Sequence, residues 1–301
     1  MIAFNGKVVV ITGGAGGLGR EFANSAAGLG MQLVLADVQA DALEQARAEL
    51  AAQGVPVLAV LCDVRKDEQV QALADAAIAR FGAVHLLFNN AGVGSGGLIW
   101  ENSVADWEWV LGVNLWGVIH GVRIFTPLML AAARADPQFE GHIVNTASMA
   151  GLVNAPAMGV YNVSKHAVVS LTETLFHDLQ LVDAPIGVSV LCPYFVPTGI
   201  SASHRNRPDD VKVAADPTAS QLAAQAMTAK AVASGKVSAA EVAALTFEAI
   251  AAGQFYIYSH PGAMAGVAAR CDDMVRQNNP ADPFEATPQV RAMLRSRLAA
   301  P

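Results

Sequence analysis

The chain has 301 residues, of which 53% are hydrophobic and 15% charged, and its formal net charge is −7. This composition excludes disorder for the bulk of the chain, because there is ample apolar surface to bury. The acidic balance argues against a nucleic-acid partner, which needs a basic face to neutralise phosphates. There is no uninterrupted apolar run of about 18 residues, which argues against a transmembrane helix.

The three cysteines, Cys62, Cys192 and Cys271, are widely spaced and form no CxxC pair. This spacing suggests neither a zinc site nor a disulfide framework, so no metal is expected. We expect all three to be small buried hydrophobes in a reducing compartment. The N-terminal run Lys7–Thr12 is short and ends in glycines, unlike a signal peptide, so the expected location is the cytoplasm.

Short apolar runs alternate with helical patterns as far as residue 191. Because the runs are rich in β-branched residues and lack polar alternation, they predict strands buried on both faces of a parallel sheet. We predict strands at residues 8–11, 33–36, 57–61, 86–88, 143–145 and 188–191, and helices at 18–29, 40–52, 67–80, 104–133 and 160–182. This order predicts an α/β fold, a doubly wound parallel sheet (Rossmann fold) with right-handed crossovers.

The C-terminal third has a different character. Residues 199–250 are alanine-rich and mostly helical in pattern. Beyond them we predict a strand at 255–258, helices at 263–277 and 288–299, and a loop at 278–283. Because there is no internal repeat or low-complexity linker, we expect one domain over residues 1–301, with a helical C-terminal extension at 260–301.

A glycine-rich loop, Thr12-Gly-Gly-Ala-Gly-Gly-Leu-Gly19, follows directly on the first predicted strand and opens a helix. Glycines permit positive φ and close approach of the backbone to a ligand. The helix N-terminus offers unpaired N–H groups and a positive dipole end, which suit a pyrophosphate. The position between strand and helix favours a dinucleotide site over a plain tight turn. The candidate cofactor contacts in this loop are Gly13, Gly17, Leu18 and Gly19.

Asp37 ends the second predicted strand, 18 residues beyond Gly19. In a dinucleotide fold a carboxylate at this place accepts hydrogen bonds from the adenosine ribose hydroxyls. Its charge would repel a 2′-phosphate, no Arg or Lys occupies positions 13–19, and Val38 follows it. These features favour NAD over NADP as cofactor. A solvated strand-end carboxylate is the alternative interpretation.

Tyr161 and Lys165 are four residues apart in a helical pattern, so they share one helix face. An ammonium about 4 Å from the phenol favours the phenolate by roughly three pKa units at most, before desolvation opposes it. A tyrosine tuned in this way can take a proton from an alcohol near neutral pH. Ser148 follows the strand 143–145, at the strand end where ligands bind in open α/β sheets. No Gly-x-Ser-x-Gly elbow surrounds it, which disfavours a hydrolase.

Taken together, these motifs resemble those of the short-chain dehydrogenase/reductase family. The matching pieces occur in family order over about residues 5–200: Thr12-Gly13…Gly17-Leu18-Gly19, Asp37, Asp63-Val64, Asn89-Asn-Ala-Gly92, Asn114, Ser148, Tyr161-Asn-Val-Ser-Lys165 and Pro193…Val196-Pro-Thr198. The resemblance implies an NAD(P)-dependent oxidoreductase.

The resemblance also implies roles for four catalytic residues. Tyr161 would be the general base in oxidation and the general acid in reduction. Lys165 would hold the nicotinamide ribose and lower the pKa of the tyrosine, while Ser148 would position the substrate oxygen. Asn114 would anchor a water that links Lys165 to solvent, although a mid-helix asparagine alone is usually a packing residue.

Further cofactor contacts follow from the same resemblance. They are Asp63 and the Val64 backbone at the adenine, Asn90, Ala91 and Gly92 beside the adenosine ribose, and Val196 and Thr198 at the nicotinamide carboxamide, with Pro193, Tyr161 and Lys165 also in contact.

The chain departs from the family after Pro193, where glycine is usual and Tyr194 stands here. We expect its ring to border the nicotinamide or substrate, in an aromatic-lined wall suited to an aromatic or apolar alcohol. A ring that merely fills loop space is the alternative. Other side chains expected to line the substrate site with Ser148 and Tyr161 are Met149, Asn154, Met158 and Phe195.

Residues 199–237 form a stretch longer than a simple connection, and we predict that they form a mobile helical lid that excludes water during hydride transfer. Within it, His204-Arg-Asn-Arg207 would suit an anionic substrate group, but a solvated basic patch is the favoured interpretation. The remaining histidines show no metal-ligand spacing, and we assign them structural or surface roles.

The favoured function is NAD-dependent, reversible interconversion of a small-molecule secondary alcohol and a ketone by hydride transfer. One alternative is a catalytically silent NAD-binding sensor or scaffold, against which intact Ser148, Tyr161 and Lys165 argue. Another is epimerisation or dehydration on the same scaffold. The helices at 104–133 and 160–182 resemble those that pair across subunits in the family, so a homodimer or homotetramer is expected. No nucleic-acid or membrane partner is expected.

Overall fold

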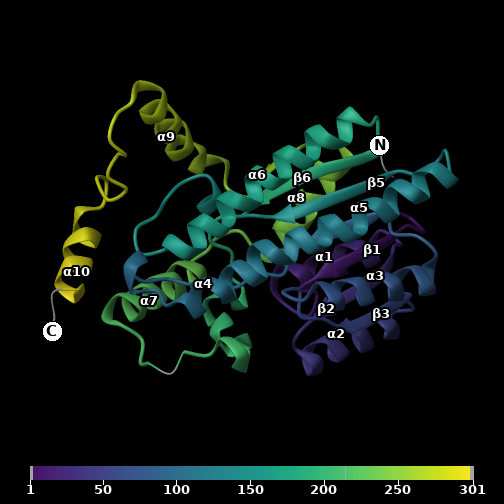
Figure 1. Cartoon of the computed structure of the whole chain (residues 1–301), viewed down its shortest axis with the longest axis horizontal. Coiled ribbons are helices and arrows are strands. Elements are labelled where there is room, and N and C mark those ends of the chain that lie inside the picture. The colour runs from purple at the N-terminus through teal and green to yellow at the C-terminus, as the bar shows by residue number, and fades with distance from the viewer. Residues whose placement is uncertain (1–2, 214, 299–301) are drawn as a thin grey trace.

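The computed structural model describes residues 3–213 and 215–298. Its centre is a seven-stranded parallel sheet in the order β3-β2-β1-β4-β5-β6-β7 (Figure 1). The strands are β1 (Val8–Thr12), β2 (Gln32–Asp37), β3 (Val57–Leu61), β4 (Leu86–Asn89), β5 (Gly141–Thr146), β6 (Ile186–Cys192) and β7 (Tyr256–Tyr258). The strand order reverses between β1 and β4, which creates the switch point at which open α/β sheets bind ligands. The predicted doubly wound sheet is confirmed.

The helices include those that cover both faces of the sheet and those of the C-terminal third. They are α1 (Gly17–Gly28), α2 (Ala40–Ala52), α3 (Asp67–Phe81), α4 (Val104–Leu111), α5 (Gly117–Ala135), α6 (Gly159–Leu181), α7 (Ala219–Ala233), α8 (Ala239–Ala251), α9 (Met264–Arg276) and α10 (Pro288–Leu298). On one face, the strands pack with α1, α2 and α8 through side chains such as Phe22, Leu43 and Phe247. On the other face they pack with α3, α5 and α6.

The first strand shows why the apolar runs lack polar alternation. Val9 and Ile11 belong to the core on the α1 and α8 side, whereas Val8 and Val10 belong to the core on the α3 and α5 side. Successive side chains of a strand point to opposite faces, so a strand covered on both sides is apolar throughout. Burying each of these side chains stabilises the fold by roughly 1.5–3 kcal/mol.

The helix predicted at 104–133 is interrupted. The α-helix α4 begins after a capping box between Ser103 and Asp106 and ends at Leu111, and α5 starts at Gly117. Between them, η2 (Gly112–Trp116) is a π-helical segment in which hydrogen bonds span five residues. Such segments are rare and are frequent at functional sites. The expectation of one uninterrupted helix is therefore wrong over these five residues.

By length and composition, the helical run Val104–Ala135 would be able to cross a membrane. Core helices of other proteins meet the same criterion. Here Val118, Phe125 and Met129 on this run are buried against the sheet and its neighbouring helices.

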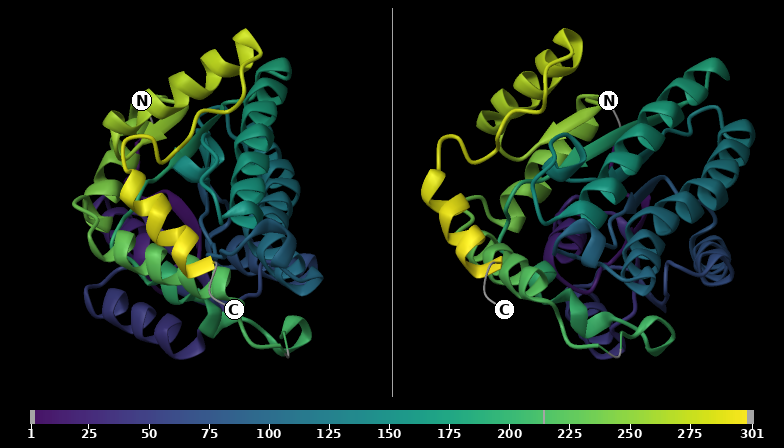
Figure 2. Two further views of the ribbon diagram at one scale, coloured as in Figure 1. Left: turned by 90° about the vertical axis from the view of Figure 1, so that its left-hand side faces the viewer. Right: turned by 60° about the vertical axis from the view of Figure 1, so that its left-hand side comes forward.

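The C-terminal third is partly integral to the sheet layers. Phe247 of α8 and Ile257 of β7 lie in the same core as the first strands. Beyond β7, α9 and α10 form an arm joined by a long loop, and α10 packs against α7 (Figures 1 and 2). The helix predicted at 288–299 spans 288–298, and residue 299 lies outside the described residues.

The cysteine expectation holds for two residues only. Cys62 and Cys192 are buried, but Cys271 is exposed on α9. The apolar side chains that attach α9 to the core are Met264 and Val267. Cys271 lies outside that contact, so its assignment as a buried hydrophobe is corrected.

Candidate active site

The polar residues singled out in the sequence gather at the carboxyl edge of the sheet. Thr12 and Asp37 end β1 and β2, while Asn89 and Thr146 end β4 and β5. Because all paired strands are parallel, these ends share one edge. The loops that follow them therefore surround the switch point between β1 and β4.

The glycine-rich loop forms a bare helix N-terminus at this edge. Helix α1 begins at Gly17, and its N-cap, Gly16, has no side chain to bond the first-turn N–H groups. Gly13 and Gly17 have φ values of +66° and +55°, which favour glycine. A Cβ on Gly19 would overlap the Gly13 carbonyl oxygen and lie 2.9 Å from Asn90 Nδ2. The loop is thus a cradle whose free N–H groups fit an anionic phosphate.

Thr12 and Asn90 brace this loop against the one that follows β4. The Thr12 hydroxyl accepts from the backbone N–H groups of Asn90 (2.9 Å) and Ala91 (3.1 Å). Asn90 Nδ2 donates back to the Thr12 carbonyl at 3.0 Å. Sequence analysis did not count Thr12 as a site residue, although a hydroxyl at the end of the strand before the glycines was the available signal.

Asp37 lies beside the glycine loop, with its carboxylate held by the backbone. One oxygen accepts from the Ala15 N–H at 3.1 Å and the other from the Gln39 N–H at 3.0 Å. The residue is 8% exposed, whereas the neighbouring Val38 is 45% exposed. A buried, oriented carboxylate with spare acceptor sites suits a pair of ribose hydroxyls.

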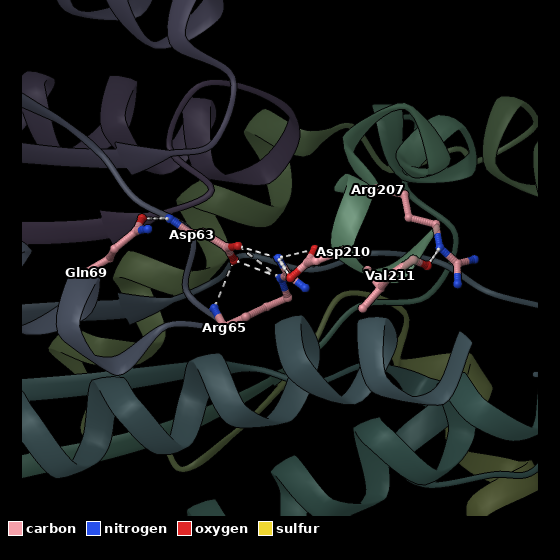
Figure 3. A network of polar contacts seen from close by, with 6 residues as sticks. All are labelled: Asp63, Arg65, Gln69, Arg207, Asp210 and Val211. Atoms are coloured by element: carbon pink, nitrogen blue, oxygen red, sulfur yellow. Dashed lines mark hydrogen bonds and ion pairs between the residues drawn. The ribbon is translucent and has the colours of Figure 1, made fainter. Parts of the chain in front are cut away.

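Asp63 and Val64 follow β3, next to this carboxylate. The Asp63 carboxylate is paired with the Arg65 guanidinium, with Nη2 2.7 Å from Oδ2 and Nε within 3.1 Å of both oxygens (Figure 3). The side chain of Val64 is buried in the core. Its backbone is therefore the only part of Val64 suited to the expected adenine contact.

The expected catalytic residues come together on α6 and the loop after β5. Tyr161 and Lys165 are 8% and 3% exposed, one helical turn apart. Lys165 Nζ donates to the Thr146 carbonyl at 2.8 Å and lies 5.8 Å from the centroid of the Tyr161 ring. The Ser148 hydroxyl hydrogen-bonds the Tyr161 hydroxyl. The structure thus brings Ser148, Tyr161 and Lys165 into one cluster.

Burial dominates the electrostatics of this cluster. It raises the pKa of Tyr161 above its ordinary 10, an effect that the hydrogen bond from Ser148 opposes. It also lowers the pKa of Lys165 from 10.5 to about 8. The pKa of Tyr161 is therefore raised rather than lowered, because desolvation of the phenolate is its largest cause and the opposing contribution comes from Ser148.

Asn114 lies in the π-helical segment and is fully buried. Its Oδ1 accepts from the Val93 N–H at 2.8 Å, and its Nδ2 donates to the Val93 carbonyl and to the Ser164 hydroxyl. The side chain is thus committed to the loop after β4 and to α6. If residue 114 anchors a water, its backbone carbonyl is the group left to do so.

Gly92 connects the cofactor loop with the catalytic cluster. A Cβ at this position would lie 3.5 Å from Asn114 Oδ1 and 3.7 Å from Lys165 Nζ. No other residue type leaves this space open beside the lysine. The loop of Asn90, Ala91 and Gly92 therefore approaches the Lys165 ammonium at Gly92.

The segment after β6 supplies the opposite wall. The Pro193 carbonyl accepts from the Met149 N–H at 2.9 Å, which ties this segment to Ser148. Thr198 lies against Gly17, 3.4 Å from where a Cβ of that glycine would be. The side chain of Val196 is buried in the core, which leaves its backbone for the expected nicotinamide contact.

Tyr194 and Met149, both expected to line the substrate site, differ in exposure to solvent. Tyr194 is 47% exposed and lies 4.6 Å from the Phe195 ring and 5.7 Å from the His260 ring, centroid to centroid. Met149 is 2% exposed within the core around α6 and β6. The side chain of Met149 packs in this core, and its contact with substrate stays a prediction. His260, assigned only a structural or surface role from sequence, adjoins Tyr194.

Residues 199–237 contain helical segments that lie over the loop after β4. These are η4 (Gly199–Asn206), η5 (Asp209–Val211) and α7. The Ser203 hydroxyl accepts from the Gly94 N–H and the Ser220 hydroxyl from the Leu98 N–H, both at 2.8 Å. The helical part of the lid prediction thus agrees with the structure, while its mobility stays a prediction.

The sequence His204-Arg-Asn-Arg207 is neither a uniform solvated patch nor a free anion site. Arg207 pairs with Asp106 at 2.5 Å, and its guanidinium lies 5.1 Å from the Trp109 ring centroid. Arg205 donates to the carbonyls of Gly199 and Ala202 within its own segment. His204 and Arg205 are exposed, as the solvated interpretation expects, whereas Arg207 is paired with Asp106 and departs from it.

Within residues 3–213 and 215–298, no group of three or more His, Cys, Asp or Glu side chains is arranged to hold a metal ion. The groups suited to bind a ligand on the same sheet edge as Ser148, Tyr161 and Lys165 are the glycine cradle and the Asp37 carboxylate. These groups fit a nicotinamide dinucleotide, since they offer phosphate and ribose partners along one edge of the sheet.

Comparison with known proteins identifies the family. The family model described as short chain dehydrogenase matches residues 7–209. The chain belongs to the short-chain dehydrogenase family. Its fold superposes with a TM-score of 0.91 on a crystal structure of a short chain dehydrogenase/reductase from Burkholderia phymatum in complex with NAD, at 56% identity over 94% of this chain and 99% of that one.

Two relatives of known name are also similar to this short-chain dehydrogenase. It is 34% identical to the CLA biosynthesis dehydrogenase/reductase of Lactiplantibacillus plantarum over 86% of this chain and 89% of the relative. It is 33% identical to 1-deoxy-11-beta-hydroxypentalenate dehydrogenase of Streptomyces exfoliatus over 90% of this chain and 89% of the relative. The chain is therefore an oxidoreductase with a nicotinamide dinucleotide site.

Proposed function

We propose that this short-chain dehydrogenase interconverts a secondary alcohol and a ketone by hydride transfer, with NAD as its cofactor. The observation that carries the proposal is the cluster of Ser148 with the buried Tyr161 and Lys165, on the sheet edge that also bears the glycine cradle. Gly92 has no side chain between Lys165 and the loop after β4, so a cofactor bound along that loop would lie beside the lysine.

The residues of the chain would divide the work between them. When bound, the dinucleotide accepts or delivers the hydride. Tyr161 Oη takes the alcohol proton in oxidation and returns it in reduction, and Ser148 Oγ holds the substrate oxygen. Lys165, fixed by the Thr146 carbonyl, places a positive charge near the phenol and bonds the nicotinamide ribose. Positioning and this local field supply most of the acceleration.

The preference for NAD rests on Asp37. Two backbone N–H groups fix its carboxylate at the end of β2, where it accepts from ribose hydroxyls and repels a 2′-phosphate. The next residue, Val38, is exposed and offers no positive charge to compensate. The solved relative from Burkholderia phymatum carries NAD, which agrees with this preference.

The substrate is proposed to be an apolar or aromatic alcohol. Tyr194, Phe195 and His260 form an aromatic cluster next to the segment that carries Pro193 and contacts Ser148. The Tyr194 N–H donates to the Ser259 hydroxyl at 3.0 Å, which fixes the backbone from which the ring projects. We expect Tyr194→Gly to raise KM for aromatic alcohols more than for small aliphatic ones. Equal kinetics across both classes would remove Tyr194 from the substrate wall.

The direct test is turnover. Purified protein with NAD is screened against aromatic, steroid, sugar and aliphatic secondary alcohols by the absorbance of the reduced nicotinamide. We expect Tyr161→Phe to abolish turnover while NAD still binds, and Tyr256→Phe, on the distant strand β7, to retain activity. Binding of NAD without turnover of any alcohol would favour a silent sensor or scaffold. Substrate conversion without net NADH would favour epimerisation or dehydration.

Assembly into a homodimer or homotetramer is part of the proposal. A groove along η2, α5 and α6 supports it: its apolar lining includes the partly buried side chains of Leu115, Val122, Ala167 and Leu171, beside the polar Ser170, Thr174 and Asp178. Light scattering on the purified protein measures the assembly. A cytoplasmic location stays a prediction.

A further inference from the structure

Arg65 connects two parts of the molecule that lie 145 residues apart in the sequence. Its guanidinium grips the Asp63 carboxylate through Nε and Nη2, and its backbone N–H donates to the same carboxylate at 3.1 Å. The same Nη2 also reaches the Asp210 carboxylate, 3.2 and 3.3 Å from its two oxygens (Figure 3). Asp63 belongs to the adenine end of the cofactor site, and Asp210 belongs to η5 of the lid.

The contacts to Asp63 link any ligand of that carboxylate to Arg65. Arg65 presents three N–H groups in four contacts, two on each oxygen. A carboxylate offers about four acceptor sites, so an amino group of a nucleotide base bonded to Asp63 shares an oxygen with Arg65. Gln69 fixes the backbone of Asp63, because its Oε1 accepts from the Asp63 N–H at 2.8 Å. Both the side chain and the backbone of Asp63 are therefore held in one orientation.

The lid end of the connection is a short, well-anchored turn. Arg207 Nε donates to the Val211 carbonyl at 2.7 Å, which closes residues 207–211 on themselves (Figure 3). The same arginine pairs with Asp106 of α4, so the turn is attached to the body on that side. On the other side, Arg65 pairs with Asp210, and Val211 is buried in the core beside Trp109. A change in the position of Arg65 therefore acts on the Asp210 end of the turn.

The fit of Arg65 is specific to arginine. Its side chain is 11% exposed, and its stem passes 3.1 Å from the place that a Cβ of Gly112 would occupy. Lysine has a single ammonium and no planar fork, so it cannot bond both oxygens of Asp63 and reach Asp210 at once. Burial opposes the charge of Arg65, but the two carboxylates outweigh it, and its pKa is raised.

We propose that Arg65 is a positioning residue that couples occupancy of the adenosine end of the cofactor site to the lid turn 207–211. A nucleotide base bonded to Asp63 fixes the Asp63–Arg65 pair, which then holds Asp210 and keeps the turn against the body. By thermodynamic reciprocity, the closed turn strengthens nucleotide binding by the same factor. The inference rests on the proposed function in one respect, that Asp63 faces the adenine.

The size of the coupling follows from the exposure of its outer link. The Asp210 side chain is 56% exposed, so its pairing with Arg65 is screened by solvent. We therefore expect the coupling factor to be about two- to fivefold rather than orders of magnitude.

The test uses adenosine monophosphate, which carries the adenosine end and no nicotinamide, with the full-length chain. Lys212 is exposed directly after the turn, so trypsin cleavage there reports on closure of the turn. We expect AMP to slow this cleavage about two- to fivefold in the wild type. Asp210→Asn should lose the protection and bind AMP more weakly by the same factor. Asp216→Asn, an exposed acid in the same segment, is the matched control and should behave as wild type.

Arg65→Lys provides a second, independent arm. It keeps the charge, but we expect it to lose both the protection and part of the AMP affinity. If wild-type protein fails to bind AMP, the proposed cofactor site and this inference fall together. If AMP binds and protects Lys212 equally in the wild type, Asp210→Asn and Arg65→Lys, only the coupling is overturned. Protection lost equally in Asp216→Asn would also overturn it, because a general charge effect would then suffice.

Discussion

Replacement of Lys165, the lysine proposed to be catalytic, should stabilise the protein near neutral pH while it abolishes activity. Lys165 is 3% exposed, and its ammonium donates to the Thr146 carbonyl at 2.8 Å. Burial lowers its pKa from 10.5 to about 8, a difference of about 2.5 units. Each unit corresponds to about 1.4 kcal/mol, so keeping this lysine charged in the folded state costs about 3 kcal/mol. A fold optimised for stability alone would not place a lysine here.

The dependence on pH fixes the sign of the effect. The folded-state pKa lies below the unfolded-state value, so the cost is fully present below about pH 8. It declines between pH 8 and 10.5, where the folded protein has released the proton and the unfolded chain still holds it. Lys165→Met removes the cost but leaves the Thr146 carbonyl without its donor, which costs about 1 kcal/mol. The variant should therefore be about 2 kcal/mol more stable at pH 7 and about equal to wild type at pH 9.5.

Denaturant unfolding of the cofactor-free protein at pH 7 and pH 9.5 measures this difference, and alcohol oxidation measures the loss of activity. Lys230→Met, at an exposed position on α7, is the matched control and should show no such pH-dependent gain. The reasoning would be refuted if Lys165→Met were no more stable than wild type at pH 7. A gain of the same size at both pH values would also refute it, since the gain would then come from packing rather than from the lysine proton.

Three further changes test the cofactor cradle, the cofactor preference and a buried histidine. Gly19→Ala should abolish NAD binding, because its Cβ overlaps backbone, whereas Gly28→Ala on the same helix meets nothing within 4 Å and should bind NAD normally by calorimetry. Asp37→Ala with Val38→Arg should reverse the ratio of kcat/KM for NAD and NADP; an unchanged ratio would contradict the role of Asp37. Burial lowers the pKa of His142 from 6.5 to about 4. As pH falls from 6.5 to 4, the unfolded chain binds a proton at this residue before the folded protein does, so wild type should lose about 3 kcal/mol of stability. His142→Gln should lose correspondingly less in denaturant titrations over the same pH range.

Most of the sheet was predictable because it is covered on both faces. An apolar run such as Val8–Ile11 can be recognised as a strand from composition alone, since every side chain in it is buried. The π-helical segment was not predictable, because nothing in its composition departs from an α-helix. Next to it, Gly117 makes a close approach that the sequence pattern does not show: a Cβ there would lie 2.7 Å from the Val64 side chain. That close approach is a tertiary contact, and no local pattern encodes it.

The same contrast between local pattern and tertiary contact applies to the candidate site. Tyr161 and Lys165 were found through their spacing, which a helix converts directly into a shared face. The direction of the pKa shift of Tyr161 was not predictable from spacing, because burial is its largest cause and depth of burial is not visible in the sequence. Arg65 and His260 were missed because their partners are distant: Asp210 lies 145 residues beyond Arg65, and Tyr194 lies 66 residues before His260. Nothing local distinguishes them from ordinary surface residues.

The direction of proton transfer follows from the same burial. Because burial raises the pKa of Tyr161, the phenol keeps its proton at neutral pH and is ready to donate it to a ketone. Oxidation needs the phenolate, which becomes more abundant as pH rises. We therefore expect kcat/KM for alcohol oxidation to rise by up to about tenfold per pH unit through the neutral range. We expect kcat/KM for ketone reduction to stay constant in that range and to fall above about pH 8, because Lys165 loses its charge there. Initial rates in both directions between pH 6 and 10 measure this, and an oxidation optimum below pH 7 would mean that a group other than Tyr161 takes the proton.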